Sequence, residues 1–290
     1  MPVRATKRGQ ERTPLERDCD VLVCGASFAG LAVARELAGA GAHVLVVDRY
    51  EIGERQTSAC AMPTGWMTAL ELSPSLLQSF DELVVHTPWH TGRWALPWSF
   101  STFDYGGVCD LLWEQATVAR EDEVEFETAT ITGRRGWTVE TDRGELRAPL
   151  VVDALGWRRT LSNAHPIQPP NARLSRGLEV HPEGRGEEME LWIDAGYVRA
   201  GYGWSFPAHD ELRVGVGSFW PAHHVKEPTV RLARDLGLPP LAPDADRVMV
   251  CGSPAMLADT CALLDARGFE ISAHIGAPGD YVIERAFVAR

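Results

Sequence analysis

The segment 20–48 constrains the fold more than any other part of the chain. It holds two short apolar runs, at 21–23 and 44–47, and neither run alternates with polar residues. Uninterrupted runs of this kind are typical of parallel strands that are covered on both faces. The apolar residues between the runs recur at helical spacing: Leu31, Ala34 and Leu37. The segment therefore predicts a strand, a helix and a second, parallel strand.

The turn between the first strand and the helix is rich in glycine. Gly25 permits a tight turn, and Gly30 lets the helix pack closely on the strand. Ser27 stands where the middle glycine of a dinucleotide-binding turn would be. The free N–H groups of the helix start favour a pyrophosphate, and Asp48 is placed to accept hydrogen bonds from a ribose. The segment predicts a dinucleotide site, the alternative being a purely structural strand–helix–strand unit.

The candidate cofactor-binding residues follow from this placement. Those of the turn and the second strand end are Gly25, Ala26, Ser27, Ala29, Gly30, Asp48 and Arg49. Asp153 and Gly156 follow a later apolar strand that we expect in the same sheet, and they are further candidates to face the cofactor. The alternative for these two residues is a plain turn that ends the strand.

Cys60 is the candidate catalytic residue, since it lies in a loop of small and polar residues that follows the second strand. Loops at the carboxyl ends of such strands face the ligand crevice, which would bring Cys60 near the cofactor ring. A buried loop cysteine that acts as a small hydrophobic residue is the alternative.

Composition narrows the class of protein. A net charge of -12 argues against a nucleic-acid partner, and no apolar run approaches the roughly 20 residues that span a bilayer. Residues 1–17 are polar and basic, so we expect a disordered tail and no secretory signal. The six cysteines form no C-x-x-C pair, which predicts reduced thiols and a cytoplasmic location. The histidines form no metal signature, so we expect no metal site.

The second half of the chain predicts a sheet that could hold a ligand. Aromatic residues crowd 83–103, which suits the wall of a cavity for a large apolar ligand or the packing of a sheet against its neighbour. Residues 103–107 predict a turn and 111–119 an amphipathic helix. After a proline-rich linker at 166–171, antiparallel strands are expected at 178–181, 190–194, 197–207 and 212–219. Glycines beside aromatics in the last two strands suit close approach by a flat ring or a prenyl chain, or tight sheet packing.

Residues 18–237 resemble FAD-dependent oxidoreductases of the geranylgeranyl reductase type, which are related to the aromatic hydroxylases. The matching stretches are 25–30, 56–60, 151–156 and 201–207. The resemblance implies FAD, with the adenosine end on Asp48 and the pyrophosphate on the glycine turn. It also implies an apolar substrate held by a sheet domain over the flavin ring. The implied chemistry is hydride or electron delivery to a carbon–carbon double bond, or hydroxylation with oxygen.

This resemblance ends near Asp235, because the family's later Gly-Asp motif and helix have no counterpart here. Residues 236–290 predict a strand at 247–253, a helix from 254 to 268 and a closing strand at 278–288. They are similar to the last part of bacterial ferredoxin–NADP reductases. The similarity includes Cys251-Gly252, which lies by the nicotinamide in that family, and Phe287.

The second resemblance implies NADPH or ferredoxin as electron donor. The flavin-binding barrel of those reductases is absent, so we expect Cys251 and Phe287 to act only as packing residues. We interpret the chain as a fusion of two truncated parts. The 247–253 strand could pair with the edge that the truncated first domain leaves vacant, although its residues show no adaptation to that site.

The predicted fold class is α/β, with a truncated Rossmann-like FAD-binding domain, an antiparallel substrate sheet and a short α/β C-terminal unit. The expected domains are the tail 1–17, the FAD-binding domain 18–165, the substrate domain 166–235 with a contribution from 83–103, and the unit 236–290. The predicted function is an FAD-dependent oxidoreductase acting on an apolar, isoprenoid-like substrate. A non-functional fusion with weak or no flavin binding and an NADP(H)–flavin electron-transfer protein are the alternatives.

Overall fold

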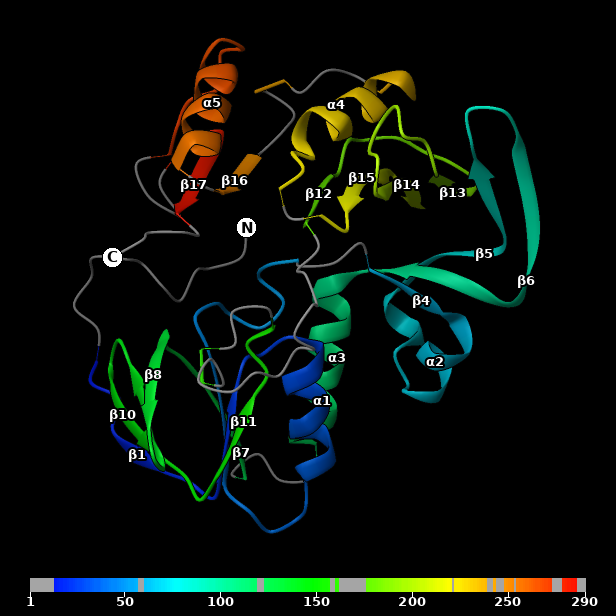
Figure 1. Ribbon diagram of the computed structural model, residues 1–290. Coiled ribbons are helices and arrows are strands. Elements are labelled where there is room, and N and C mark those ends of the chain that lie inside the picture. The colour runs from blue at the N-terminus through cyan, green and yellow to red at the C-terminus, as the bar shows by residue number, and fades with distance from the viewer. Residues whose placement is uncertain are drawn as a thin grey trace. The chain divides into compact units, whose positions relative to one another are not determined.

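A computed structural model describes residues 13–56, 60–118, 123–156, 160–161, 176–220, 222–238, 242–243, 248–252, 254–272 and 278–285 (Figure 1). The chain divides into two compact units, one ending at Leu232 and the other beginning at Ala233. The expected linker at 166–171 and Phe287 lie outside the described residues.

A four-stranded parallel sheet organises the first unit. Its strand order is β11 (Leu150–Asp153), β2 (Val21–Cys24), β3 (Val44–Asp48) and β7 (Val124–Thr128), and each neighbouring pair is parallel. Helix α1 (Phe28–Leu37) connects the two central strands. The strand, helix and strand predicted from residues 20–48 are confirmed.

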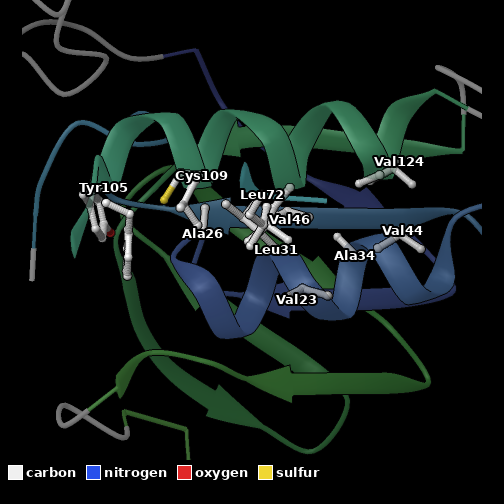
Figure 2. Close-up of a cluster of buried hydrophobic side chains, with 14 of the residues drawn as sticks. Val23, Ala26, Leu31, Ala34, Val44, Val46, Leu72, Tyr105, Cys109 and Val124 are labelled. Atoms are coloured by element: carbon white, nitrogen blue, oxygen red, sulfur yellow. The ribbon is translucent and has the colours of Figure 1, made fainter. Parts of the chain in front are cut away.

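Both faces of this sheet are covered, which explains its uninterrupted apolar runs. Because successive side chains point to opposite faces, Val23 and Val46 belong to a core beneath α1 and α3 (Tyr105–Thr117) (Figure 2). Leu22 and Leu45 belong to a second core on the other face. All four side chains are fully buried.

A second sheet supplies the cover on the far face. Its order is β1 (Arg17–Asp18), β10 (Gly144–Arg147), β9 (Thr138–Thr141) and β8 (Ile131–Arg135). The last three strands are antiparallel, and β1 joins β10 in parallel. Alternate residues of these short strands complete the second core, as period-two patterning predicts.

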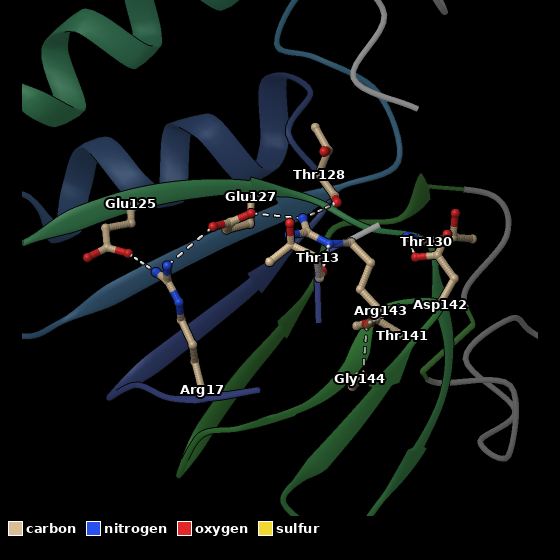
Figure 3. Close-up of polar contacts among 10 residues, drawn as sticks. All are labelled: Thr13, Arg17, Glu125, Glu127, Thr128, Thr130, Thr141, Asp142, Arg143 and Gly144. Atoms are coloured by element: carbon tan, nitrogen blue, oxygen red, sulfur yellow. Dashed lines mark hydrogen bonds and ion pairs between the residues drawn. The ribbon is translucent and has the colours of Figure 1, made fainter. Parts of the chain in front are cut away.

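Residues 13–16, which directly precede β1, contact the rest of the first unit, so for these residues the disordered tail expected over 1–17 is corrected. Leu15 is buried and its N–H donates to the carbonyl of Arg143 at 2.8 Å. Arg17 bonds Glu127 at 3.3 Å, and Arg143 Nη1 donates to the same carboxylate at 2.8 Å (Figure 3). Arg143 and Glu127 lie more than a hundred residues further along the chain than Leu15 and Arg17. Local composition could therefore not reveal these contacts.

A seven-stranded sheet forms the rest of the first unit, with the order β12-β15-β14-β13-β5-β6-β4. Its first part is the long hairpin of β5 (Leu76–His86) and β6 (Thr91–Phe103), which β4 (Ala61–Pro63) joins at the edge. The short helices α2 (Thr64–Ala69) and η1 (Ser73–Ser75) separate β4 from β5. The aromatic stretch predicted at 83–103 therefore lies in this sheet.

The later strands complete the sheet. They are β12 (Arg176–Val180), β13 (Met189–Trp192), β14 (Gly201–Ala208) and β15 (Glu211–Ser218). Neighbours among them are antiparallel as expected, but β13 pairs with β5 in parallel. The strand expected to begin at residue 197 begins at Gly201, because Tyr197 and the next residue turn back to bond the carbonyl of Asp194. Helix α4 (Lys226–Asp235) follows β15.

Helix α3 begins where a turn was expected. The sequence predicts a turn at 103–107 and a helix only from residue 111, but Asp104 caps a helix that starts at the next residue. The Asp104 carboxylate accepts hydrogen bonds from the N–H groups of Gly106 (3.2 Å) and Gly107 (3.1 Å). This N-cap outweighs the helix-weakening effect of two adjacent glycines.

The second unit is a small α/β arrangement. Strand β16 (Val248–Gly252) pairs in parallel with β17 (Tyr281–Arg285), and α5 (Pro254–Asp265) lies between them in sequence. Leu264 and Phe269 are buried in its core. Strand β16 therefore has a partner strand, β17, within its own unit.

Candidate functional site

A cavity of about 450 Å³ lies at the carboxyl ends of the parallel strands. Its volume is in the range of small-molecule binding sites, and this edge of an open α/β sheet is where ligands bind. The lining residues are Ala26, Ser27, Phe28, Ala29, Asp48, Arg49, Tyr50, Glu51, Gly53, Arg55, Tyr105, Ala129, Thr130, Ile131, Ala154, Leu155, Gly156 and Thr160. The structure thus brings together segments that are separated by more than a hundred residues.

Two glycines of the turn are required by close backbone packing. Gly25 has a φ of 114°, and a Cβ atom there would lie 2.4 Å from the carbonyl oxygen of Ala154. A Cβ atom at Gly30 would lie 1.7 Å from the carbonyl oxygen of Gly25. Neither distance is tolerable for a real side chain, so these glycines set the approach of α1 to the strand ends.

The first turn of α1 opens onto the cavity, with Phe28 and Ala29 in the lining. Ser27 is the N-cap residue, but its hydroxyl makes no capping hydrogen bond to the helix within the described chain. Its hydroxyl instead accepts a hydrogen bond from the hydroxyl of Tyr105 at 3.0 Å. The N–H groups of the first turn are therefore left for an anionic ligand, which the positive end of the helix dipole also favours.

Asp48 ties the second strand end to the glycine turn. Its Oδ2 atom accepts a hydrogen bond from the N–H of Ala26 at 2.8 Å, and Oδ1 accepts from the N–H of Tyr50 at 3.1 Å. A carboxylate has about four acceptor positions, so capacity for further donors remains. The carboxylate is held in the cavity lining, in a position to accept hydroxyl donors of a ligand.

Arg49, Arg55 and the half-buried acid Glu51 line the cavity with Asp48. The guanidinium carbons of Arg49 and Arg55 lie 4.6 and 5.2 Å from the centroid of the Tyr50 ring. Burial, and secondarily the charge of Glu54, raise the pKa of Glu51 above its ordinary value. This part of the cavity lining therefore carries both positive and negative side chains.

Of the two candidate residues at the end of β11 and in the loop after it, only Gly156 lines the cavity. Gly156 lies in the lining with a φ of 63° and open space around its Cβ position. Asp153 is exposed, accepts a hydrogen bond from the N–H of Leu155 at 3.2 Å, and lies outside the lining. The structure therefore brings Gly156, but not Asp153, to the cavity wall.

Cys60 lies in the core beside the turn and outside the cavity lining. Its side chain is fully buried, and its φ is 53°. Its carbonyl accepts hydrogen bonds from the N–H of Phe103 at 3.0 Å and from Nη1 of Arg213 at 3.2 Å. This environment resembles that of a packing residue, the alternative considered from sequence.

Sequence reasoning missed Tyr105, which lines the cavity, and Arg213, which is a buried structural residue outside the lining. Arg213, on β15, is buried and also donates to the carbonyl of Phe103 at 2.9 Å, which joins the large sheet to the start of α3. Tyr105 is the first residue of α3 and reaches Ser27, which lies 78 residues earlier. The arginine has no local sequence signal, whereas Asp104 followed by a helical pattern could have indicated where α3 begins.

The tryptophans of the β5–β6 hairpin fit neither interpretation made from sequence, whereas Phe103 at the end of β6 is packed in a core. Trp89, Trp94 and Trp98 are 90%, 54% and 57% exposed, so they are neither packed in a core nor part of the cavity described above. His86 stacks on Trp192 with ring centroids 4.7 Å apart. The hairpin thus presents aromatic surface to solvent.

A second hollow of about 510 Å³ lies on the large sheet, lined by residues that include Gln78, Arg185 and Asp210. Arg185 and Asp210 form an ion pair there, with Nε and Oδ1 2.8 Å apart. None of the lining residues named for this hollow belongs to the glycine turn or to the first turn of α1. It therefore lacks the features that define the first cavity.

Across the described chain, no group of three or more histidine, cysteine, aspartate or glutamate residues is arranged to hold a metal ion. Among the helices described, none is both long enough and apolar enough to cross a membrane.

The α/β fold and the cavity at the strand ends are typical of a dinucleotide-binding protein. Comparison with known families indicates that the dinucleotide is FAD. Residues 18–74 match the model of the FAD binding domain, which contains the glycine turn, α1 and Asp48. A solved structure with the same fold is a geranylgeranyl bacteriochlorophyll reductase-like protein from Thermoplasma acidophilum. It has a TM-score of 0.59 and 16% identity, covering 76% of this chain and 62% of that protein.

Curated relatives match the two resemblances found in the sequence. Digeranylgeranylglycerophospholipid reductase 3 of Methanosphaera stadtmanae is 23% identical over 223 residues, covering 69% of this chain and 56% of that protein. Ferredoxin--NADP reductase of Pseudomonas aeruginosa is 57% identical over 60 residues, covering 21% of this chain and 23% of that protein. The chain therefore spans only part of the length of each relative, and FAD is the cofactor that its matched domain indicates.

Proposed function

We propose that the protein is an FAD-dependent oxidoreductase acting on an apolar substrate. The observation that carries the proposal is the cavity at the carboxyl ends of β2, β3 and β11, whose glycine turn and Asp48 carboxylate lie in the segment matched to the FAD binding domain. Bound FAD would supply hydride or electron transfer. The protein's residues bind and orient the cofactor.

Each candidate residue has a role in this proposal. Ala26, Ser27 and Ala29 would hold the pyrophosphate, because the first turn of α1 lines the cavity and a helix N-terminus favours an anion. Gly25 and Gly30 would allow the helix to approach. Asp48 would accept hydrogen bonds from the adenosine ribose, and Arg49 would add positive charge beside it. Gly156 would line the opposite wall, with Asp153 supporting its loop through Leu155.

The substrate class rests on the large sheet and on the relatives. Tyr202, Phe219 and Trp220 expose apolar surface at one end of β14 and β15, where Tyr202 and Phe219 lie with ring centroids 6.2 Å apart. The relative named digeranylgeranylglycerophospholipid reductase supports an isoprenoid-like substrate. The reaction would be reduction of a carbon–carbon double bond or flavin-dependent hydroxylation.

An NADP(H)–flavin electron-transfer protein is the second candidate function. It is supported by the 57% identity over 60 residues to a ferredoxin--NADP reductase. The second unit alone has no counterpart of the glycine turn within its described residues, so the flavin in this candidate would occupy the same cavity of the first unit.

The visible absorbance spectrum of the purified protein, before and after addition of FAD and desalting, tests the proposal. Flavin absorbance that co-purifies or is retained supports it. A folded protein that retains no flavin contradicts it and favours the interpretation as a non-functional fusion. Anaerobic assays of a flavin-loaded sample with dithionite and an isoprenoid alkene, and aerobic assays for hydroxylated product, then separate the two reactions.

A further inference from the structure

Ser27 is unusual both for a dinucleotide turn and for a helix N-cap. A serine N-cap commonly satisfies a helix N–H with its own hydroxyl, but no such bond is made at Ser27 in the described chain. The hydroxyl is half-buried in the cavity lining and accepts its hydrogen bond from Tyr105 at 3.0 Å. Ser27 Oγ therefore has its own hydrogen left to donate elsewhere.

Tyr105 is held firmly in the position that makes this bond. It is buried, and its ring packs against that of Phe28 with centroids 5.0 Å apart. Asp104 fixes the start of α3 directly before it through two backbone hydrogen bonds.

The direction of the bond between the two hydroxyls leaves Ser27 as a donor. The tyrosine hydroxyl has one hydrogen, and it is donated to Ser27 Oγ. The hydrogen of the serine hydroxyl is therefore not used in this bond, and Ser27 lies in the cavity lining.

We infer that Tyr105 is a positioning residue that orients the Ser27 hydroxyl to donate a hydrogen bond to the diphosphate of the cofactor. A glycine at this position would instead let the backbone approach the phosphate directly. The serine hydroxyl replaces part of that contact by a side-chain donor, and a hydrogen bond to an anionic oxygen is stronger than one between neutral groups. The inference rests on the proposed FAD site and adds a residue that the glycine turn alone does not contain.

A double-mutant cycle with three ligands tests the inference. FAD affinity is measured by quenching of flavin fluorescence, and ADP and adenosine are measured by displacement of FAD. Loss of the donor in Ser27→Ala should lower the affinity for FAD and for ADP by about tenfold, and Tyr105→Phe should lower both affinities by about threefold. The double variant should bind like Ser27→Ala alone, because Tyr105 acts only through Ser27. Adenosine, which has no phosphate, should bind every variant like the wild type.

Tyr197→Phe is the matched control, since Tyr197 lies outside the cavity lining and its ring keeps the contact with Arg231. It should bind all three ligands like the wild type. The inference is overturned if Tyr105→Phe keeps wild-type affinity for FAD and ADP, or if the two losses multiply in the double variant. Equal weakening of adenosine and ADP would also overturn it, because that result indicates a general loosening of the site. A wild-type protein that binds neither FAD nor ADP overturns the proposed function as well.

Discussion

Replacing Gly30 by alanine should disrupt the dinucleotide turn more than any other single methyl group. Helix α1 lies so close to the first strand end that the added Cβ atom would sit 1.7 Å from the Gly25 carbonyl oxygen and 2.9 Å from its carbonyl carbon. Both atoms are backbone, so no side-chain rotation can relieve the overlap. The helix must shift away from the strand end, in a region where Gly30 is itself buried.

The size of the effect follows from the kind of clash. Overpacking a well-packed core costs about 1–3 kcal/mol when side chains can adjust. Here only a backbone shift helps, so we expect the free energy of unfolding to fall by about 3 kcal/mol or more. We also expect loss of FAD retention, because the first-turn N–H groups move with the helix.

Gly65 offers the matched control. It lies exposed in helix α2, has no neighbour within 4 Å of its Cβ position, and does not have a positive φ. Gly65→Ala should therefore raise the free energy of unfolding by about 0.5–1 kcal/mol. Urea unfolding followed by circular dichroism, with FAD binding measured in parallel, compares the two variants. Equal stability of Gly30→Ala and Gly65→Ala, with FAD retained in both, would refute the reasoning.

Four further outcomes are expected. Asp48→Ala should weaken FAD by about tenfold or more, since a charged acceptor is lost, and an unchanged affinity in a fluorescence titration would remove Asp48 from the site. Arg213→Met should lower the free energy of unfolding by about 2–4 kcal/mol because the buried Phe103 carbonyl loses a donor, and a wild-type urea midpoint would contradict this. NADPH should not reduce bound flavin at a useful rate, because hydride transfer needs the reacting atoms within roughly 3–3.5 Å and the described residues of the reductase-like unit form no flavin-binding barrel. Rapid anaerobic bleaching that Cys251→Ala abolishes would contradict this. Burial raises the pKa of the Cys24 thiol from 9.0 to about 12, so between these pH values the folded state binds more protons than the unfolded state. The free energy of unfolding should therefore fall as the pH rises from about 9 towards 12, and it should fall more in the wild type than in Cys24→Ala.

The local part of the cofactor site could be predicted from sequence. Apolar runs of strand length, helical spacing between them and glycines at the turn are short-range patterns, and each acts through its own backbone. The segment 20–48 therefore forms the expected elements, and Gly25 and Gly30 have the conformations and close contacts that the pattern requires. The acid that ends β3 also lies at the turn, because parallel strands bring their carboxyl ends to one edge.

The tertiary structure alone decided which distant residues complete the site. Tyr105 meets Ser27 across 78 residues, and Arg213 meets Phe103 across 110, and neither pair has a periodic signal that links its members. The same holds for β13, which joins β5 in parallel, and for the buried Leu15. Such contacts form because a buried polar group must find a partner and an apolar side chain must leave water, and many positions could satisfy those needs until the chain is folded.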